Sequence, residues 1–519
     1  MELKKLTLEE ANNFNSLFLD YISQKPDLSD FYDEFPTVAG LFNALKKRNF
    51  PDSTRSVLAD SFRRQYEGFT VSEAVKQNIE LLKSPDTFTI TTGHQLNVFT
   101  GPLYYIYKLV TVINTTKKLK EAYPQYNFVP VYWMASEDHD FDEINHFNLF
   151  GKKYVWETDQ QGAVGRFDTS SISELIDQLP EEVPMFRKAY EGAANLAAAV
   201  RSYVNDLFGE EGLLIIDPDD QPLKSLFTRV IEEDVLRSAC EPLAVENTNR
   251  LEKLGYKGQV HPREINFFYM KGDVRERIVR DGAHFQVLNT GISFSETKMQ
   301  DLITNEPEVF SPNVILRPLF QETILPNLAY VGGPSEAVYW LQLKSIFDNF
   351  ETPFPALMPR NFALVVNAGS RKKIEKVGLS YHQLFYKGDQ LKKHYVRAEA
   401  ENEFHLKSEK KELSEFFEKL KEKAAQIDGS LQGFIGAEQA KTLKSIDNIE
   451  KRLRKSEEQK HETALKQIEG IKEKLFPNGG LQERHDNFLN FYLNNPGFVQ
   501  ELLDSFDPFD YQFNLLIDG

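Results

Sequence analysis

The sequence predicts an α/β protein, built on a parallel sheet and extended by a long helical arm. Two apolar strands, at residues 86–92 and 127–136, flank a helical segment that starts near Gly101-Pro102. This strand–helix–strand order predicts adjacent parallel strands joined by a right-handed crossover. A heptad pattern of apolar residues then fills much of residues 395–476, which is typical of a coiled coil.

The first elements follow from periodicity and turn residues. Residues 1–85 are helical in pattern, and we expect them to form an N-terminal helical cover of the core. The core itself is expected at residues 86–394, with connecting insertions at about 151–210 and 241–310. The helix after the first strand is expected to be amphipathic, with Pro102 in its first turn.

Later core elements are expected from the same signals. GLLIIDPDD, at residues 212–220, predicts another strand, followed by a helix from Pro222 to about Cys240. Residues 255–300 have the pattern of short strands and turns, and MPRNFALVV at 358–366 predicts one further strand.

The arm at residues 395–476 leaves three interpretations open. An antiparallel helical hairpin, pairing between subunits and a solvated arm without chemistry all fit its pattern. Residues 477–519 are expected to return to the core. The first half of the heptad pattern consists of Leu413, Phe417, Leu420, Ala424, Ile427, Leu431 and Phe434.

Composition excludes several classes of protein. The net charge of −17 disfavours nucleic acid as a partner, because phosphate binding needs clustered Lys and Arg. The single cysteine, Cys240, excludes an internal disulfide framework and a CxxC zinc site, and we expect it to be structural. The start of the chain lacks a signal-peptide pattern and no apolar run is long enough for a membrane span. We therefore expect a cytoplasmic protein without a membrane partner.

The loop after the first strand is the first candidate binding segment. Thr91 to His94 fits the T-x-G-H pattern found after the first strand of class I synthetase-like nucleotidyltransferases. Glycine lets a backbone approach a phosphate, and a helix N-terminus favours negative charge. The alternative is an ordinary tight turn between strand and helix. The candidate residues for substrate or nucleotide binding here are Thr92, Gly93, His94, Gln95, Asn97 and Gly101.

The loop after the second strand is the candidate catalytic segment. Acidic residues and imidazoles are concentrated from Glu137 to His146, with Asp138, His139 and Asp140 as the proposed catalytic group. Such a set can bind an amine, hold a divalent metal or act in acid–base catalysis. The spacing of the histidines does not indicate a zinc site, and we assign no metal ligands. Helix capping by Asp138 or Asp140, with the other carboxylates solvated, is the alternative.

A third cluster follows later in the chain. A glycine pair before a predicted helix can bind an anion at the helix N-terminus, although an acidic residue in that first turn is also a normal partner of the helix dipole. Arg317 precedes a proline and suits a carboxylate or phosphate, with a structural salt bridge as the equal alternative. The candidate binding residues of this cluster are Asn313, Arg317, Tyr330, Gly332, Gly333 and Glu336.

Three segments together resemble one family, the bacillithiol biosynthesis cysteine-adding enzymes, which are cysteine ligases. They are TTGHQLNVFTGPLYYIYK, PVYWMASEDHDFDEINH and FSPNVILRPLFQETILPNLAYVGGPSEAVYWLQLK. Their order and the late helical arm match as well. The resemblance implies a Rossmann-like core of the class I synthetase/nucleotidyltransferase type and a coiled coil that supports a homodimer. It also implies the addition of L-cysteine to the amine of glucosaminyl malate.

The implied reaction constrains the roles of the residues. A free carboxylate is a poor acyl donor, so activation by adenylation or phosphorylation is expected, with ATP inferred by analogy of fold. Gly93, His94 and the Gly101 helix start would bind phosphates, and Arg317 with Asn313 would orient a carboxylate. Relatives with Gln-Gln in place of His94-Gln95 argue against His94 as an obligatory base.

Other functions remain open from the sequence alone. Another small-molecule nucleotidyltransferase would use the same loops. A non-catalytic coiled-coil dimer scaffold would tolerate Asp138→Ala or Arg317→Ala. A tRNA ligase is disfavoured by the acidic balance and by the absence of zinc and lysine-loop signatures.

Overall fold

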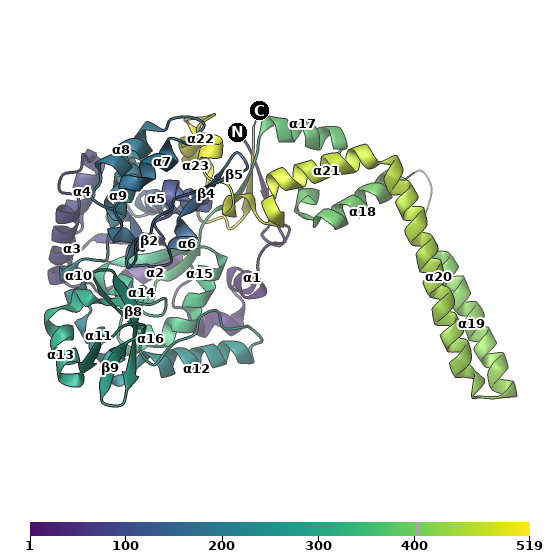
Figure 1. The fold of residues 1–519 in the computed structure, drawn as a ribbon, viewed down its shortest axis with the longest axis horizontal. Helices are drawn as coiled ribbons and strands as arrows, with labels where there is room; N and C mark the ends of the chain where they lie inside the picture. Colours follow the sequence, from purple (N-terminus) through teal and green to yellow (C-terminus); the bar gives the residue numbers. More distant parts are fainter. Residues whose placement is uncertain (401–404, 519) are drawn as a thin grey trace. The chain divides into compact units, whose positions relative to one another are not determined.

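The computed structural model describes residues 1–400 and 405–518, and the chain divides into two compact units. The first unit comprises residues 1–365 and 481–516, and the second comprises residues 366–480 with the end of the chain from Ile517. Figure 1 shows the elements of both units coloured along the sequence. Each unit is described by itself below.

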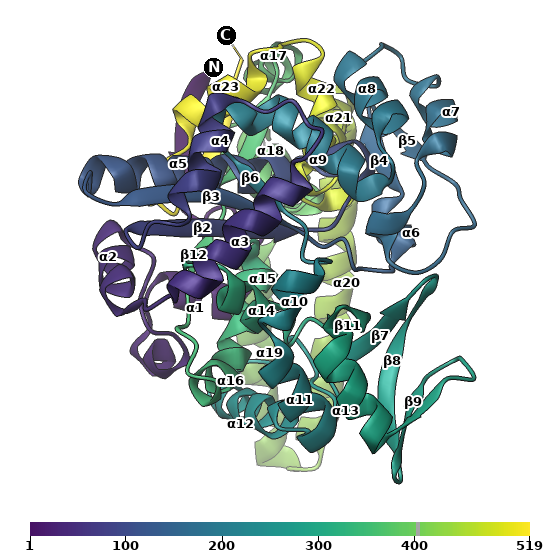
Figure 2. The ribbon, with the colours of Figure 1, turned by 90° about the vertical axis from the view of Figure 1, so that its left-hand side faces the viewer.

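The centre of the first unit is the predicted parallel sheet, with strand order β13-β12-β2-β3-β6. All four neighbouring pairs in this sheet are parallel, and Figure 2 shows the labelled strands β12, β2 and β3 side by side. The strands are buried on both faces, as their continuous apolar runs require. They are β2 (Thr87–His94), β3 (Asn127–Met134), β6 (Leu214–Ile216), β12 (Asn327–Gly332) and β13 (Ala356–Pro359).

Helix α5 (Tyr104–Ala122) connects β2 to β3 and packs on both strands. We expected an amphipathic helix, but most of its residues are buried, because α23 (Phe498–Ser505) from the C-terminal segment also packs against it. Pro102 lies just before the helix rather than in its first turn. The residues at 481–516 therefore complete the core around α5.

The N-terminal segment is mostly helical, as predicted, but it begins with a strand. β1 (Glu2–Leu6) joins a three-stranded sheet of order β1-β15-β14. β1 is exposed along most of its length, so apolar periodicity gave no signal for it. The other elements of this sheet and segment are β14 (Phe362–Val366), β15 (Phe513–Ile517), α1 (Ser16–Ile22), η1 (Pro26–Phe31), α2 (Val38–Lys47), α3 (Asp52–Gln65) and α4 (Glu73–Leu81).

The single strand predicted at 358–366 is two strands in two different sheets. β13 ends at Pro359, and β14 starts at Phe362. Between them, the backbone N–H of Arg360 donates to Gly332 O at 2.9 Å and its side chain is buried. The chain thus changes sheets at a buried turn that has no glycine to signal it.

The first insertion, between β3 and β6, is mainly helical and contains one short hairpin. Its longest helix, α9, covers Leu196–Phe208. The elements are α6 (Phe141–Ile144), β4 (His146–Leu149), β5 (Lys152–Val155), η3 (Val164–Arg166), η4 (Ser170–Ile172), α7 (Ser173–Ile176), α8 (Pro184–Gly192), α9 (Leu196–Phe208) and η5 (Gly209–Glu211).

The second insertion contains the predicted short strands, in a five-stranded sheet of order β10-β9-β8-β7-β11. The helix predicted from Pro222 to about Cys240 is two helices, because α10 ends at Ser225 and α11 begins at Thr228. α11 ends at Arg237, where Ser238 takes a left-handed conformation with φ of 53°. Figure 2 shows α11 and α13 beside this sheet. The elements are α10 (Gln221–Ser225), α11 (Thr228–Arg237), α12 (Cys240–Lys253), β7 (Phe267–Lys271), β8 (Val274–Asp281), β9 (His284–Val287), β10 (Ser293–Ser295), α13 (Glu296–Asn305), η6 (Pro307–Val309) and β11 (Phe310–Pro312).

The remaining elements of the first unit surround β12 or close the chain. α15 begins directly after the Gly332-Gly333 pair, as expected. They are α14 (Arg317–Ile324), α15 (Pro334–Tyr339), η7 (Trp340–Leu343), α16 (Lys344–Asn349), η10 (Gln482–Arg484) and α22 (Leu489–Tyr492).

The second unit contains the arm, and its long helices form a hairpin. α19 (Lys407–Ile427) and α20 (Leu431–Lys460) are joined by three residues and pack against each other. Residues 401–404 of the predicted arm lie outside the described part of the chain. The unit also contains α17 (Ala368–Val377), η8 (His382–Phe385), α18 (Gly388–Glu399), α21 (Glu462–Leu475) and η9 (Pro477–Gly479).

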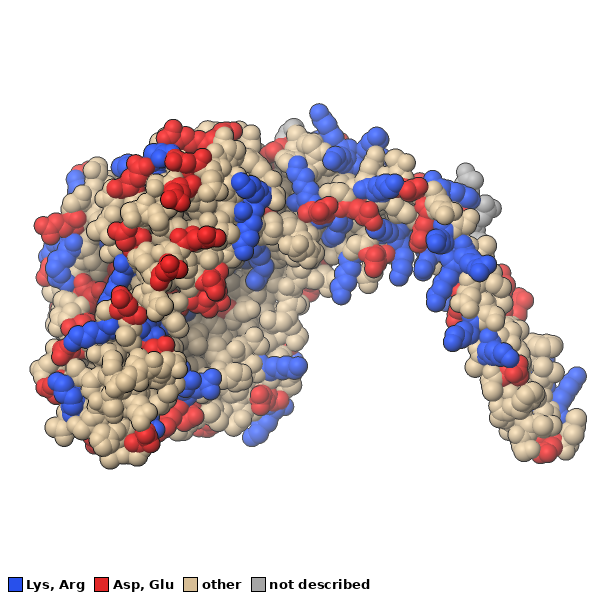
Figure 3. All heavy atoms as spheres, in the orientation of Figure 1, with Lys and Arg blue, Asp and Glu red and all other residues tan. Residues whose placement is uncertain are grey.

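The arm's charges are mixed rather than segregated. Figure 3 shows Lys and Arg side chains interspersed with Asp and Glu along the second unit, in line with the expectation that the Lys-rich segment is balanced. In the part of the chain that the structure describes, no helix has both the length and the apolar character needed to span a membrane.

Candidate active site

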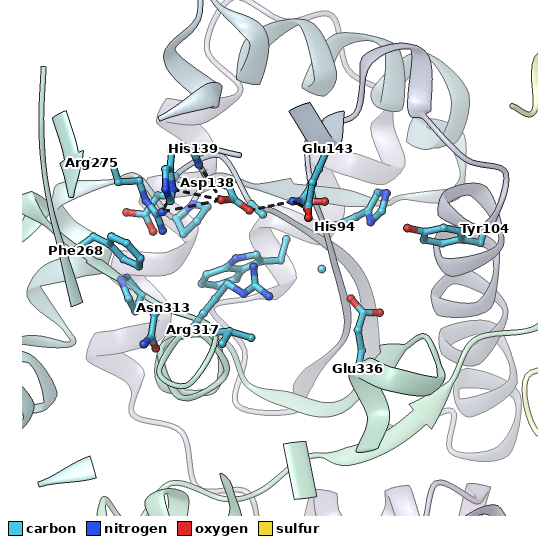
Figure 4. A pocket seen from close by; sticks show the side chains of 18 residues that line it. His94, Tyr104, Asp138, His139, Glu143, Phe268, Arg275, Asn313, Arg317 and Glu336 are labelled. Atoms are coloured by element: carbon cyan, nitrogen blue, oxygen red, sulfur yellow. Dashed lines mark hydrogen bonds and ion pairs between the residues drawn. The ribbon is translucent and has the colours of Figure 1, made fainter. Parts of the chain in front are cut away.

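A cavity of about 460 Å³ lies at the carboxyl ends of β2, β3 and β6, and we call it the main cavity. Ligands of open α/β sheets bind outside the carboxyl ends of the strands. The hairpin sheet of the second insertion and the starts of α14 and α15 close its other sides (Figure 4). Its lining residues are Gly93, His94, Gln95, Tyr104, Trp133, Ala135, Glu137, Asp138, His139, Glu143, Pro218, Phe268, Arg275, Pro312, Asn313, Val314, Arg317 and Glu336.

The main cavity brings together residues from all three predicted clusters. Figure 4 shows Asp138 and Glu143 across the cavity from Arg317 and Glu336. More than 170 residues separate these two pairs in the sequence, so only the sheet order makes them neighbours. The predicted site residues in the lining are Gly93, His94, Gln95, Asp138, His139, Asn313, Arg317 and Glu336.

The other predicted site residues lie around the main cavity rather than in its lining. The Thr92 hydroxyl donates to Val331 O at 2.7 Å, and Asn97 donates to Glu143 O at 3.3 Å. Gly101 has φ of 58°, and a Cβ there would lie 2.5 Å from that of Asn97. These residues shape the loop after β2.

Four further predicted residues also lie outside that lining. Tyr330 stacks on Trp340, with 4.3 Å between the ring centroids. Gly332 and Gly333 end β12 and lead into α15, and Asp140 is exposed. Their contacts are with the protein's own elements.

Hydrogen bonds from neighbouring residues hold the Asp138 carboxylate in the main cavity. Its Oδ2 accepts from Gln95 Nε2 at 3.1 Å, and its Oδ1 accepts from the His139 backbone N–H at 2.8 Å. Burial opposes its ionisation, but the Arg275 guanidinium and the Gln95 amide hold its pKa below the ordinary value. Asp138 is therefore an ionised hydrogen-bond acceptor at neutral pH.

Arg275 forms the wall beside Asp138. Its guanidinium lies 4.1 Å from the centroid of the Phe268 ring, and its Nε donates to Ser311 Oγ at 3.2 Å. Its NH1 lies 4.0 Å from Asp138 Oδ1 and contacts His139 Nδ1. Burial, followed by the Arg275 charge, lowers the pKa of His139. Because a guanidinium only donates, His139 accepts at Nδ1 and carries its proton on Nε2.

A buried chain of hydrogen bonds positions Asn313. Both carboxylate oxygens of Asp234 accept from Asn266, at 2.6 Å from its backbone N–H and 3.0 Å from Nδ2. Asn266 Oδ1 in turn accepts from Asn313 Nδ2 at 3.0 Å. The Arg317 backbone N–H donates to Asn313 O at 2.9 Å. Asp234, which is fully buried, thus orients the Asn313 side chain through Asn266, and Asn313 O accepts the backbone N–H at the start of α14.

Glu336 is fixed by a buried lysine from the middle of α5. Lys108 Nζ lies 2.5 Å from Glu336 Oε2 and donates to Gly93 O at 2.9 Å. The Gly333 backbone N–H donates to the same Glu336 oxygen at 2.7 Å. Burial opposes ionisation, yet Lys108 and this N–H keep the pKa of Glu336 below its usual value. The pair ties the loops after β2 and β12 together and leaves a carboxylate in the cavity.

His94 is a buried, neutral imidazole in the cavity wall. Its ring stacks on Tyr105, with 4.9 Å between centroids. Burial and the nearby charges of Lys108 and Arg360 hold its pKa well below the ordinary value. Its Nε2 atom is buried and has no hydrogen-bond partner among the described residues. A buried nitrogen in this state has the capacity to bond a ligand.

The acidic loop is also braced from behind. Lys224, fully buried, pairs with Glu137 and donates to Phe310 O at 2.5 Å. The backbone N–H groups of Val164 and Gly165 donate to Asp138 O at 2.7 Å and Ser136 O at 2.8 Å. The loop 136–138 therefore has fixed contacts on both sides.

The donor set gives no sign of a metal centre. Within residues 1–400 and 405–518, no group of three or more His, Cys, Asp or Glu side chains is arranged to hold a metal ion. Cys240 is buried at the start of α12, and burial raises the pKa of its thiol. It packs as part of the second insertion.

Sequence reasoning missed several residues of the main cavity. Arg275 and Phe268 lie on two strands of a hairpin whose turn was expected, but nothing local indicates that this hairpin covers the sheet end. Pro218 follows the predicted acidic strand, and Tyr104 opens the predicted helix. Both residues follow a strand of the parallel sheet, so the tendency of ligands to bind at strand ends was the signal that could have identified them. Trp133 lies within β3, where its apolar character gave no sign of a binding role.

Comparisons with known proteins agree with this architecture. Residues 1–361 match the family model described as Bacillithiol biosynthesis BshC, N-terminal Rossmann-like domain. Residues 363–517 match the C-terminal coiled-coil domain of the same family. A relative from Cytophaga hutchinsonii is 42% identical, covering 99% of this chain and 98% of its own length.

Other relatives are similar over comparable lengths. One from Flavobacterium johnsoniae is 41% identical and covers 98% of this chain and 99% of its own. A more distant one, from Chlorobaculum tepidum, is 28% identical over 97% of both chains. All three are named "Putative cysteine ligase BshC".

Proposed function

The chain belongs to the bacillithiol biosynthesis BshC family, and on this premise we propose that it is a cysteine ligase. The proposed reaction joins the carboxyl group of L-cysteine to the amine of glucosaminyl malate by an amide bond. This would be the last step of bacillithiol assembly. The relatives' names support the donor and the type of enzyme.

One observation carries the proposal: a single cavity at the strand ends holds both fixed cations and fixed carboxylates. Arg317 and Arg275 supply guanidinium groups, and Asp138 and Glu336 supply carboxylates held in ionised form. Guanidinium matches a substrate carboxylate, and a carboxylate matches a substrate ammonium group. A ligase that joins an amino acid to an amine needs both within one site.

The acceptor carboxylates are assigned to the Arg317 side of the main cavity. The Asn313 side chain is held by the buried chain of hydrogen bonds from Asp234, and Asn313 O accepts the Arg317 backbone N–H. A fixed guanidinium beside a fixed amide suits the dicarboxylate of a malate group. Arg275, already engaged by His139 and Phe268, adds positive charge from the facing wall.

Asp138 is assigned to the amine. As amide formation proceeds, a carbon–nitrogen bond forms to the cysteine carbonyl carbon, the bond from this carbon to its activated oxygen breaks, and the amine releases a proton. An ionised Asp138 accepts a hydrogen bond from the amine and orients it. Its lowered pKa makes it an orienting group more than a strong base. His139, with its proton on Nε2, acts as a donor beside it.

ATP is the proposed activator, and the residues present fit it. When bound, it supplies the phosphoryl or adenylyl group that turns the cysteine carboxylate into an acyl donor. His94 and Gly93 lie together in the lining of the main cavity, and His94 Nε2 has no hydrogen-bond partner among the described residues. His94 would bond a phosphate oxygen, and Gly93 would allow close approach. His94 is not assigned as a base, because its pKa is depressed.

The arm supports a second part of the proposal, a homodimer. Along the α19–α20 hairpin, apolar side chains stay exposed: Ile427 at 83%, Phe434 at 65% and Phe416 at 55%. Exposed apolar residues at heptad positions indicate a helical partner. A second copy of the arm supplies the matching surface.

The proposal is tested in cells that lack this gene. Thiol metabolites would be compared after complementation with wild type, with Asp138→Ala, or with Glu246→Gln, a change at an exposed position of α12. We expect accumulated glucosaminyl malate and no bacillithiol in the deletion strain. Wild type and Glu246→Gln restore the thiol, and Asp138→Ala does not. An unchanged thiol pool in the deletion strain would contradict the proposal.

A further inference from the structure

A second cavity, of about 360 Å³, adjoins the main cavity. The two share His139 and Arg275 in their linings, so these side chains form a shared wall at which the two cavities meet (Figure 4 shows both from the side of the main cavity). We call it the polar cavity. Its lining residues are His139, Gln160, Gln161, Gly162, Phe167, Asp273, Val274, Arg275, Glu276, Asn289 and Thr290.

From this cavity we propose a second subsite for the acceptor, which binds its amino-sugar part. The proposal rests on the proposed function and deepens it, since it names the place of one half of the substrate. The dicarboxylate half then lies at Arg317, and the amine is presented at the shared wall.

The lining chemistry of the polar cavity selects the class of ligand. Its side chains are mainly amides, hydroxyl groups and carboxylates, which exchange hydrogen bonds with sugar hydroxyls. The lining contains two carboxylates, those of Asp273 and Glu276, and one guanidinium, that of Arg275. This balance disfavours phosphates and dicarboxylates and favours a neutral or cationic hydroxylated group. In the main cavity, Arg317 supplies a second guanidinium group in addition to that of Arg275.

The cavity is built from fixed parts. Gln160 is held by the backbone of Asp168, since Oε1 accepts from Asp168 N–H at 2.7 Å and Nε2 donates to Asp168 O at 3.0 Å, and Nε2 also donates to Thr158 Oγ1 at 3.0 Å. Gly162 has φ of 91°, and a Cβ there would lie 3.0 Å from the Asp273 carbonyl. Asn289 Nδ2 donates to Glu276 Oε2 at 3.1 Å. A preformed polar site of this kind loses little entropy when it binds a ligand.

The shared wall gives the reaction its geometry. Arg275 is buried and held by Phe268 and Ser311, so the wall keeps its position. Asp138, the proposed amine ligand, lies 4.0 Å from Arg275 NH1. An amino sugar in the polar cavity therefore directs its amine past His139 to Asp138 and to the acyl donor in the main cavity. One cavity of this size also suits only one such molecule, since small-molecule sites measure about 300–1,000 Å³.

The test uses two fragments of the acceptor as inhibitors of product formation: methyl α-D-glucosaminide and L-malate. The variant Gln161→Ala/Glu276→Gln removes two polar cavity groups, and Gln221→Ala/Glu246→Gln makes the same changes at exposed positions outside both cavities. We expect the inhibition constant of the glucosaminide to rise at least about fivefold in the first variant, with that of malate changed by less than about twofold. The control variant keeps the wild-type constants.

Every other outcome overturns the inference. An unchanged glucosaminide constant places the sugar elsewhere, while product formation by wild type leaves the proposed function standing. An equal rise for both fragments indicates a distorted shared wall rather than a sugar subsite. If the wild type forms no cysteine adduct, the proposed function fails and the inference fails with it.

Discussion

The cavity-bearing unit and the helical arm use their charged and apolar side chains in opposite ways. The first unit buries charges in pairs, such as Arg360 with Glu483 and Lys108 with Glu336. The arm keeps its ion pairs at the surface and leaves Ile427 and Phe434 exposed. Buried pairs must be matched within the chain, whereas an exposed apolar row is matched by another chain. The comparison shows that the first unit matches its charges within the chain, whereas the arm presents apolar side chains at its surface.

The largest effect is expected from breaking a buried pair of the first unit. Glu483→Ala leaves the Arg360 guanidinium, 1% exposed, without its carboxylate and removes an acceptor of the Ala363 N–H. We expect a loss of about 3–5 kcal/mol in the free energy of unfolding, measured by denaturant titration. Asp301→Ala, which breaks the exposed Lys298 pair, should cost less than about 1 kcal/mol. Equal losses of stability in the two variants would contradict the distinction between buried and surface ion pairs.

Adding a side chain at Gly165, which supports the acidic loop 136–138, should have the next largest effect on stability. A Cβ at Gly165 would lie 2.6 Å from Ser136 Cβ and 2.9 Å from Ser136 O. We expect Gly165→Ala to cost about 2 kcal/mol of stability and to lower kcat/KM, because the loop that holds Asp138 must shift. Gly192→Ala is the control, since no atom lies within 4 Å of its added Cβ. Wild-type kinetics for Gly165→Ala would show that this contact does not set the site.

The buried Asp234 gives the stability of the first unit a pH dependence near pH 6. Burial raises its pKa to about 6, above that of the unfolded chain, so the folded state binds the proton more tightly. Its contribution to stability is therefore present at low pH and is lost as pH rises through about 6. We expect this loss to be about 1–2 kcal/mol between pH 5 and pH 8. Asp234→Asn should flatten that part of the unfolding curve, and an unchanged slope would contradict the assignment.

The smallest change in free energy is expected for substitutions in the arm that weaken the association of two chains. Ile427→Lys/Phe434→Lys places charges on exposed apolar positions. We expect the dimer dissociation constant to rise at least about tenfold, or about 1.4 kcal/mol, with little change in monomer helicity. Sedimentation at several concentrations measures it, with the exposed Lys411→Ala as control. A monomeric wild type, or an unaffected dimer, would refute arm pairing through this surface.

The sequence predicted the parts of this molecule that depend on local pattern. β2, β3, the helical hairpin and the three polar clusters follow from periodicity and from residues at strand ends. Arg275 could not be predicted, because its role depends on a hairpin that folds over the sheet from a distant insertion. Lys108 lies in the middle of a helix and matters only through Glu336. Long-range pairing of this kind leaves no trace in local spacing.

The most direct test of the account is product formation by purified protein. Wild type would be incubated with L-cysteine, glucosaminyl malate and ATP, and the amide product measured by mass spectrometry, beside Asp138→Asn, Arg317→Met and the control Glu246→Gln. The account predicts product with wild type and the control, and a loss of at least about 100-fold in both cavity variants at unchanged melting temperature. Undiminished product from Asp138→Asn and Arg317→Met would contradict the claim that this cavity is the site of ligation.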